Sequence, residues 1–433
     1  MQSNRNAKKV RVEDQAANRT KATDAQPMIA AKHGRAWRRS PWSVAALTLA
    51  FYCLWTLLYL NAGNDIYSFA HISQRFAHQS HTSQVITFPP DFHYAPIAGY
   101  DGQFAYFIAA DPSHASPYLD KPNYRYTRIL YPMLARLLAL GRPDLLPYTM
   151  LLINLLAIGG GTLAVAAWLR RKGYSPWYAL VYGLAGGLFI AYQFDLTEPL
   201  AYALVALAVY LYDFGGARRY LWAGLCFGLA ALTRETTLLF ALFYGAAWAL
   251  RPGDISREAQ TMRRTIALPR AWRGATALLA LAVVPLALYK LFLSAWLGSS
   301  GVTSSDLPVL IPFQGLFAYW PWGHDQLQQV ETVVLPALLC AGVALWAVWQ
   351  GCRRLEIWNL LAHILLFVVL LHQGSYVDLT ASARVTLGIT LAAIYCLPAV
   401  GRVLRRGNAL WLLAAGALWA LPTFTALLNL IFG

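Results

Sequence analysis

Apolar runs long enough to cross a membrane recur along most of the chain and follow a polar N-terminal stretch. A helix needs about 20 apolar residues to cross the hydrocarbon core of a bilayer. Such runs, some a few residues shorter, predict eleven spans at 42–60, 144–169, 176–194, 196–213, 218–233, 235–250, 273–297, 331–350, 355–372, 383–403 and 409–431. The pattern predicts an all-α, polytopic membrane helical bundle. We expect the chain to consist of a polar tail, 1–41, and a single integral-membrane domain, 42–433, with a helical core at 144–250.

The segment 126–141 is apolar on one side and is a candidate for a twelfth span. If it crossed, the basic triplet at 170–172 would lie on the opposite side of the membrane from the basic tail. An amphipathic helix in the interface, with Arg128 and Arg136 at its polar margin, keeps both on one side. We therefore expect eleven spans and a long first extracytoplasmic loop, 61–143, that contains interfacial helices.

Charge predicts the orientation of these spans. Most of the 35 Lys and Arg residues lie in the tail and in the loops 170–172, 218–219, 251–272, 353–354 and 402–406. Basic residues favour the cytoplasmic side of a membrane protein. The N-terminus is therefore predicted to be cytoplasmic and the C-terminus extracytoplasmic, with a second extracytoplasmic loop at 298–330.

Composition supports a membrane protein. Hydrophobic residues make up 58% of the chain and charged residues 13%, whereas soluble proteins carry about 25% charged residues. The net charge of +15 does not indicate a nucleic-acid partner, because the basic residues fall between apolar runs and not on one soluble face. Four of the five cysteines lie inside apolar runs, which predicts neither a disulfide framework nor a cysteine metal site.

The first outer loop contains the sequence Tyr100-Asp101-Gly102-Gln103, directly before an apolar run at 104–110. A carboxylate at the start of a helix can cap it by accepting backbone N–H hydrogen bonds. Equally, Asp101 can face a bound lipid head group at the membrane edge. The motif alone leaves both alternatives open.

This motif resembles the first-loop signature of GPI-type mannosyltransferases, with Phe104 and Ile108-Ala109 matching the residues that follow the acid. The Tyr-Asp-Gly-Gln form, together with the stretch from Arg125 to Pro132 (RYTRILYP), is similar to bacterial relatives of that family. All belong to the GT-C superfamily of polytopic glycosyltransferases, which take a sugar from a polyprenyl-phosphate carrier. The resemblance implies a bacterial inner-membrane enzyme that transfers a hexose to a glycan, lipid or protein acceptor.

The resemblance also assigns a role to Asp101, which matches the proposed base of the family. Transfer from a sugar phosphate expels a good leaving group, so one base for the acceptor hydroxyl and cations for the phosphate are sufficient. We therefore expect metal-independent inverting displacement without a cofactor. The histidines of the first loop lack the paired spacing of a zinc site.

Few cations lie outside the basic loops, and these are the candidates for binding the donor phosphate. Arg234, Arg384 and Lys290 lie at or near predicted outer ends of helices, and Arg128 lies on the predicted interfacial helix; these four are the candidates. Arginine suits phosphate because its planar guanidinium holds two oxygens. The alternatives are a structural pair between Arg234 and the adjacent Glu235, and a Lys290 side chain that only reaches the interface.

Two carboxylates three residues apart, Asp195 and Glu198, occupy another predicted outer turn. They can bind an acceptor hydroxyl, or they can start the next helix as a capping arrangement. The predicted substrate-binding residues are Tyr100, Gln103, Asp195, Glu198, Glu235 and His324.

These features favour a membrane glycosyltransferase with an extracytoplasmic active site. The predicted partners are the lipid bilayer, a polyprenyl-phosphate sugar and a glycan or lipid acceptor. A ligase or polymerase of lipid-linked glycans shares the donor chemistry and remains an alternative. A transporter or flippase is a further alternative, although it favours polar groups near mid-bilayer. A non-catalytic scaffold leaves the outer cluster of charges unexplained.

Overall fold

The structure, a computed structural model, describes residues 40–77, 88, 92–96, 98–250, 260–298, 308–404 and 409–432. Within these ranges the chain is helical apart from turns and one isolated bridge between Ser73 and Ala95. The prediction of an all-α fold is confirmed. The basic tail predicted at 1–41 lies almost entirely outside the described residues, and the first helix of the described part, α3, begins at Pro41.

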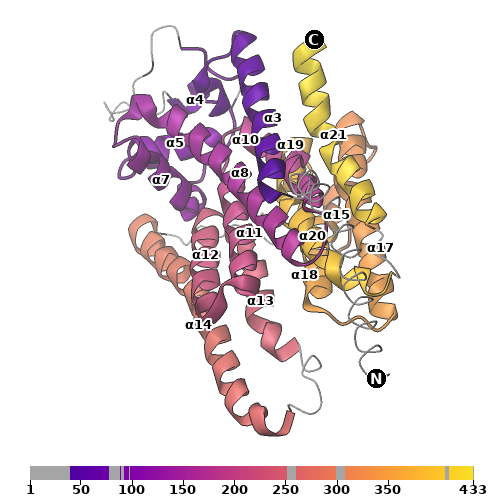
Figure 1. Cartoon of the computed structure of the whole chain (residues 1–433). Coiled ribbons are helices and arrows are strands. Elements are labelled where there is room, and N and C mark those ends of the chain that lie inside the picture. The colour runs from indigo at the N-terminus through magenta and orange to yellow at the C-terminus, as the bar shows by residue number, and fades with distance from the viewer. Residues whose placement is uncertain are drawn as a thin grey trace, which may run out of the picture.

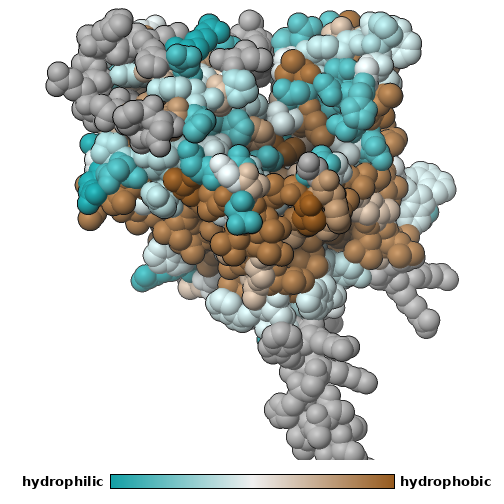
Figure 2. Space-filling view, turned by 90° about the horizontal axis from the view of Figure 1, so that it is seen from above, coloured by the Kyte–Doolittle hydropathy of each residue, from teal (hydrophilic) through white to brown (hydrophobic). Residues whose placement is uncertain are grey.

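Among the described residues, six helical stretches are long and apolar enough to cross a membrane. They are Pro41–Asn61, Pro143–Arg171, Trp272–Leu297, His324–Trp349, Leu379–Gly401 and Leu410–Phe432. Each overlaps one of the predicted spans, and large apolar side chains such as Leu57, Leu288 and Trp349 are exposed on them. Figure 2 shows a broad apolar area bordered by hydrophilic residues. The chain is a helical, multi-span membrane protein.

The other five predicted spans form helices too short to meet the same criterion. They are α11 (Glu198–Phe214), α12 (Arg219–Thr233), α13 (Leu238–Leu250), α18 (Leu355–Ile364, extended by a π-helical turn to Val369) and the interrupted pair α9 (Leu180–Gly183) and α10 (Gly186–Gln193). A helix of 15 residues such as α12 is about 23 Å long, against about 30 Å of hydrocarbon. The count of eleven spans therefore stays a prediction.

The helices pack in two groups around α8 (Leu146–Arg171), which lies against α3 and α11 (Figure 1). On one side, α12 packs between α11 and α14 (Gln260–Leu297). On the other side lie α17 (Leu335–Trp349), α18, α20 (Leu387–Gly401) and α21 (Leu410–Phe432). The approach of α12 to α14 depends on small residues, since a Cβ at Gly228 would lie 2.3 Å from the Leu281 carbonyl oxygen.

Both predicted outer loops contain short helices. The first loop forms α4 (Gln74–Ala77), α5 (Gly102–Ala110), α6 (Pro122–Arg125) and α7 (Leu130–Leu138), which lie together beside α8 (Figure 1). Helix α7, in the segment considered as a twelfth span, has nine residues and a length of about 14 Å, too short to cross. The second loop forms α15 (Gln314–Phe317) and α16 (His324–Gln329), and α16 continues through a π-helical turn into α17. Helix α14 begins at Gln260, inside the loop predicted at 251–272.

The basic turns meet at one end of the bundle. Lys172 at the end of α8 forms an ion pair with Asp213 near the end of α11 (2.8 Å between Nζ and Oδ2). The Tyr174 hydroxyl donates a hydrogen bond to the Leu397 carbonyl near the end of α20. Helix α11 starts at Glu198, which lies in the polar cluster described below, so the two ends are separated by about 25 Å.

Candidate active site

Asp101 lies at the start of α5 but does not cap it. Its side chain makes no hydrogen bond to the backbone of the first turn. Instead its carboxylate contacts two guanidinium groups, Arg384 Nη1 at 2.7 Å from Oδ2 and Arg125 Nη2 at 2.9 Å from Oδ1. The side chain is still 19% exposed. Of the two alternatives left open by the sequence, capping is wrong for Asp101, and the carboxylate faces a cluster of cations.

The glycine after Asp101 allows a close approach between the first loop and α10. A Cβ at Gly102 would lie 2.1 Å from the Phe194 carbonyl oxygen, which is a backbone atom that cannot rotate away. Gly99 adopts a positive φ of 63°, which glycine tolerates without strain. These two glycines therefore place Asp101 against the turn that carries Asp195 and Glu198.

We expect Gly102→Ala to destabilise the protein by about 1–3 kcal/mol, because the methyl group overpacks the contact with Phe194. Gly342→Ala is the matched control, since a Cβ at Gly342 in the middle of α17 meets no atom within 4 Å. The control is expected to gain about 0.5–1 kcal/mol from the lost flexibility of glycine. Thermal unfolding in detergent measures both, and equal melting temperatures for the two variants would contradict the packing argument.

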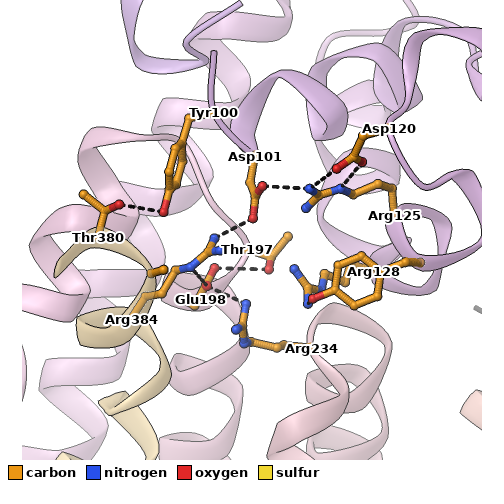
Figure 3. A network of polar contacts seen from close by, with 12 residues as sticks. Tyr100, Asp101, Asp120, Arg125, Arg128, Thr197, Glu198, Arg234, Thr380 and Arg384 are labelled. Atoms are coloured by element: carbon orange, nitrogen blue, oxygen red, sulfur yellow. Dashed lines mark hydrogen bonds and ion pairs between the residues drawn. The ribbon is translucent and has the colours of Figure 1, made fainter. Parts of the chain in front are cut away.

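Arg384 links Asp101 to a second ion pair. It comes from α19 (Leu379–Val385), and its Nε lies 3.8 Å from Glu198 Oε1 at the start of α11. Glu198 also accepts a hydrogen bond from Arg234, at the end of α12, and only 1% of its side chain is exposed. Figure 3 shows Asp101, Arg384, Glu198 and Arg234 in sequence across the site. Segments far apart in the chain thus supply one continuous polar network.

A further arginine completes the network on the side of the first loop. Arg128 donates to Glu235 (3.3 Å) and to the Tyr124 hydroxyl. The pairing of adjacent residues considered from the sequence, Arg234 with Glu235, is wrong. Each instead pairs with a residue from another segment, because the backbone of Arg234 is extended where α12 ends and directs neighbouring side chains apart.

Part of this network lines a small pocket between the first loop, α11 and α19. Its walls carry Asp101, Arg125, Arg128, Asp195, Glu198 and Arg384, together with apolar side chains of α5 and α7. Its volume of about 30 Å³ is enough for a water molecule. Among the described residues, the network of four arginines is balanced by four carboxylates, those of Asp101, Asp120, Glu198 and Glu235.

The charges of the network determine the protonation of Asp101. Burial raises the pKa of the carboxyl group, but Arg384 and Arg125 outweigh burial and hold the pKa well below its usual range. Asp101 is therefore ionised at neutral pH. Two of the pocket arginines, Arg128 and Arg384, each have a buried Nε–H that finds no hydrogen-bond partner in the described part of the chain. A buried donor without a partner costs free energy, which an anionic ligand can recover.

Asp195 differs from the other carboxylates of the pocket because it contacts no arginine among the described residues. Its Oδ1 accepts hydrogen bonds from the Tyr131 hydroxyl (2.8 Å) and from Asn154 Nδ2 (2.9 Å), and its Oδ2 has no partner there. The residue has a positive φ of 52° in the turn between α10 and α11. Burial raises its pKa to about 7, and the two hydrogen bonds only partly offset this effect.

We expect Asp195→Asn to remove a pH dependence of stability. The unfolded carboxyl group ionises near pH 4, whereas the folded one keeps its proton to about pH 7. Within this window the folded state binds more protons, so wild-type stability falls as pH rises, by about 1.4 kcal/mol per unit. The effect is measured as the difference in free energy of unfolding between wild type and variant, determined at several pH values from 4 to 8. If the free energies of unfolding of wild type and Asp195→Asn change with pH in parallel, the raised pKa of Asp195 is contradicted. Asp325→Asn, at an exposed position, is the control.

Two residues of the predicted motif have mainly structural contacts. The Tyr100 hydroxyl donates to Thr380 Oγ1 (2.9 Å), and burial raises its pKa to about 12. Gln103 is fully buried, and its amide bonds Ser73 and the Ala98 carbonyl inside the first loop. Tyr100 thus joins the first loop to α19 beside Arg384, whereas Gln103 braces the loop.

Two predicted residues lie outside the cluster. His324 is exposed at the start of α16 and contacts Gln328. Lys290 lies on α14 and does not line the pocket. The structure therefore brings together Arg128, Arg234, Arg384, Asp195, Glu198, Glu235 and Asp101, but neither of these two residues.

Sequence reasoning missed three members of the cluster as site residues, namely Arg125, Asp120 and Thr197. Arg125 lies between Asp101 and Asp120 and contacts both (Figure 3). Its Nε and Nη2 each donate a hydrogen bond of 2.8 Å to the carboxylate of Asp120. The sequence did contain a signal for Arg125. It precedes Arg128 by three residues, so a helical turn places both arginines on one face. Thr197 precedes Glu198 and donates to its carboxylate at 3.3 Å.

Among the described residues, no group of three or more His, Cys, Asp or Glu side chains is placed to hold a metal ion. Comparison of the chain with protein-family models, curated proteins and solved structures finds no match.

Proposed function

We propose that the chain is an integral-membrane glycosyltransferase of the GT-C type that uses a sugar linked to a polyprenyl phosphate. The supporting observation is the pocket in which an ionised carboxylate, Asp101, contacts Arg125 and Arg384 directly. A lipid phosphate is an anion carried at the membrane surface, and guanidinium groups are its natural ligands. The proposal includes eleven spans, a cytoplasmic N-terminus, an extracytoplasmic C-terminus and a bacterial inner membrane.

The reaction requires one bond to form as another breaks. The acceptor hydroxyl oxygen attacks the anomeric carbon, and the bond between that carbon and the phosphate oxygen breaks with its electron pair on the phosphate. Arg128, Arg234 and Arg384 stabilise the charge that develops there. The acceptor proton goes to Asp101. Because the hydroxyl attacks from the face opposite the phosphate in a single displacement, the anomeric centre is inverted, and no metal ion takes part in this mechanism.

Pairing with two arginines makes Asp101 a weak base before the donor binds. When the donor phosphate draws Arg384 toward itself, that guanidinium group stabilises the carboxylate less, and the pKa of Asp101 rises toward its ordinary value. The base thus gains strength only when the leaving group is in place. In this proposal Glu198 and Asp195, which also line the pocket, bind the hydroxyl groups of the acceptor.

The proposal is tested with the purified chain in detergent, an isotope-labelled polyprenyl-phosphate hexose, and lipid and glycan extracts as acceptors. Mass spectrometry is expected to find a product heavier by one labelled hexose, and to find the same product depleted in cells that lack the protein. Transfer of a whole oligosaccharide block would indicate a ligase. Labelled lipid that crosses vesicle membranes without any covalent product would indicate a flippase and contradict the proposal.

A further inference from the structure

A second cavity opens toward the other end of the bundle, and its α11 residues, Leu207 and Tyr210, lie about 14–18 Å along that helix from Glu198 in the Asp101 pocket. It lies between the start of α3, the second half of α8 and the middle of α11, and has a volume of about 440 Å³. We call it the α3–α8–α11 groove; its walls are Trp42, Gly160, Leu163, Ala164, Leu207 and Tyr210, and its rim carries Arg170 and Arg171. Its size is within the range of small-molecule sites.

Small residues on α8 leave the floor of this groove open. A Cβ at Gly160 would meet no atom within 4 Å, whereas at Gly159 and Gly161 it would lie within 3 Å of Leu49 and Tyr182 side chains. The two neighbouring glycines are thus needed for helix packing, but Gly160 faces empty space. Trp42 is 70% exposed and Leu207 40% exposed, so the walls present apolar surface that is not covered by the bundle.

In the described part of the chain, Arg170 and Arg171 at the rim form no ion pair with an acidic residue, whereas the adjacent Lys172 does. Lys172 pairs with Asp213, and Arg171 stacks its guanidinium against Tyr210 and Phe214, with the charge unpaired. Two arginines without an acidic partner among the described residues therefore lie at the mouth of an apolar groove.

We infer that the α3–α8–α11 groove binds an anionic phospholipid of the bilayer leaflet on this side. Its acyl chains lie along the small residues of α8, and its phosphate contacts Arg170 and Arg171. Unpaired arginines suit a phosphodiester, and basic pockets between membrane helices are known to hold anionic head groups. A zwitterionic lipid fills the apolar part equally well but adds a positive charge beside the arginines, so the groove is selective for lipids with net negative charge.

The test uses the full chain in detergent with phosphatidylglycerol or phosphatidylcholine of identical acyl chains, and counts bound lipids by native mass spectrometry. We expect phosphatidylglycerol to bind at least tenfold more tightly, and less tightly as salt screens the arginines. Arg170→Gln with Arg171→Gln is expected to weaken phosphatidylglycerol binding roughly 30-fold, about fivefold per arginine. The matched control is Arg218→Gln with Arg219→Gln, a basic pair at the same end that does not line the groove.

A second variant tests the apolar part. Gly160→Leu fills the open floor and is expected to reduce binding of both lipids while leaving the melting temperature without lipid unchanged or higher, since leucine favours a helix. The inference is overturned if the two lipids bind equally, or if the control pair weakens binding as much as the rim pair. It is also overturned if inorganic phosphate alone displaces the lipid at millimolar concentration, which would show a simple anion site.

Discussion

Asp101→Asn is expected to lower the rate of sugar transfer about 10³-fold at saturating donor, within the 10²–10⁴ range of general-base catalysis. The substitution keeps the size of the side chain and removes the group that accepts the proton. The same change releases Arg125 and Arg384 from their carboxylate partner. The freed guanidinium groups are available for the donor phosphate, so KM for the donor is expected to stay the same or fall.

This separation of kcat from KM distinguishes catalysis from a structural role, because a distorted pocket would raise KM. Asp111→Asn is the matched control, since Asp111 lies at the other end of α5 and pairs with exposed His114. The steady-state rates are measured with purified protein at equal folded fraction, checked by thermal unfolding. A wild-type kcat in Asp101→Asn would exclude this residue as the base.

Arg384→Gln is expected to give the opposite signature for the donor. Arg384 contacts Asp101 and also lies near Glu198. Its loss therefore removes a positive charge from the centre of the network. We expect kcat to fall about 10²–10³-fold, as when a preorganised donor to a developing charge is removed, and KM for the donor to rise. Arg384→Lys keeps the charge without the planar fork and is expected to recover only part of the activity.

The control for this variant is Arg142→Gln, which removes an exposed arginine paired with Asp144. Its activity is expected to match that of the wild type. The double variant Asp101→Asn with Arg384→Gln adds a second check. Because the two residues contact each other, their effects should be less than additive. Full additivity would mean that the ion pair of the structure does not operate in the reaction.

The sequence alone was sufficient for the class of fold. Runs of about 20 apolar residues have few stable alternatives to a membrane-crossing helix, since backbone groups in hydrocarbon must bond within their own segment. The positions of the long helices follow from that local rule. The broken stretch at 176–193 and the short α12 and α13 do not, because their lengths depend on how neighbouring helices cover them.

For the site, the sequence identified the kinds of residue but not their partners. Asp101 and Arg384 are 283 positions apart and contact each other, whereas the adjacent Arg234 and Glu235 pair with other segments. Local spacing determines which side chains share a helix face, and so it can propose a cap or a neighbouring pair. Which helix ends meet depends on packing across the whole bundle, such as the contact of Gly102 with Phe194. That tertiary packing decides which carboxylate each arginine neutralises, and therefore which acid is ionised and which, like Asp195, keeps its proton near pH 7.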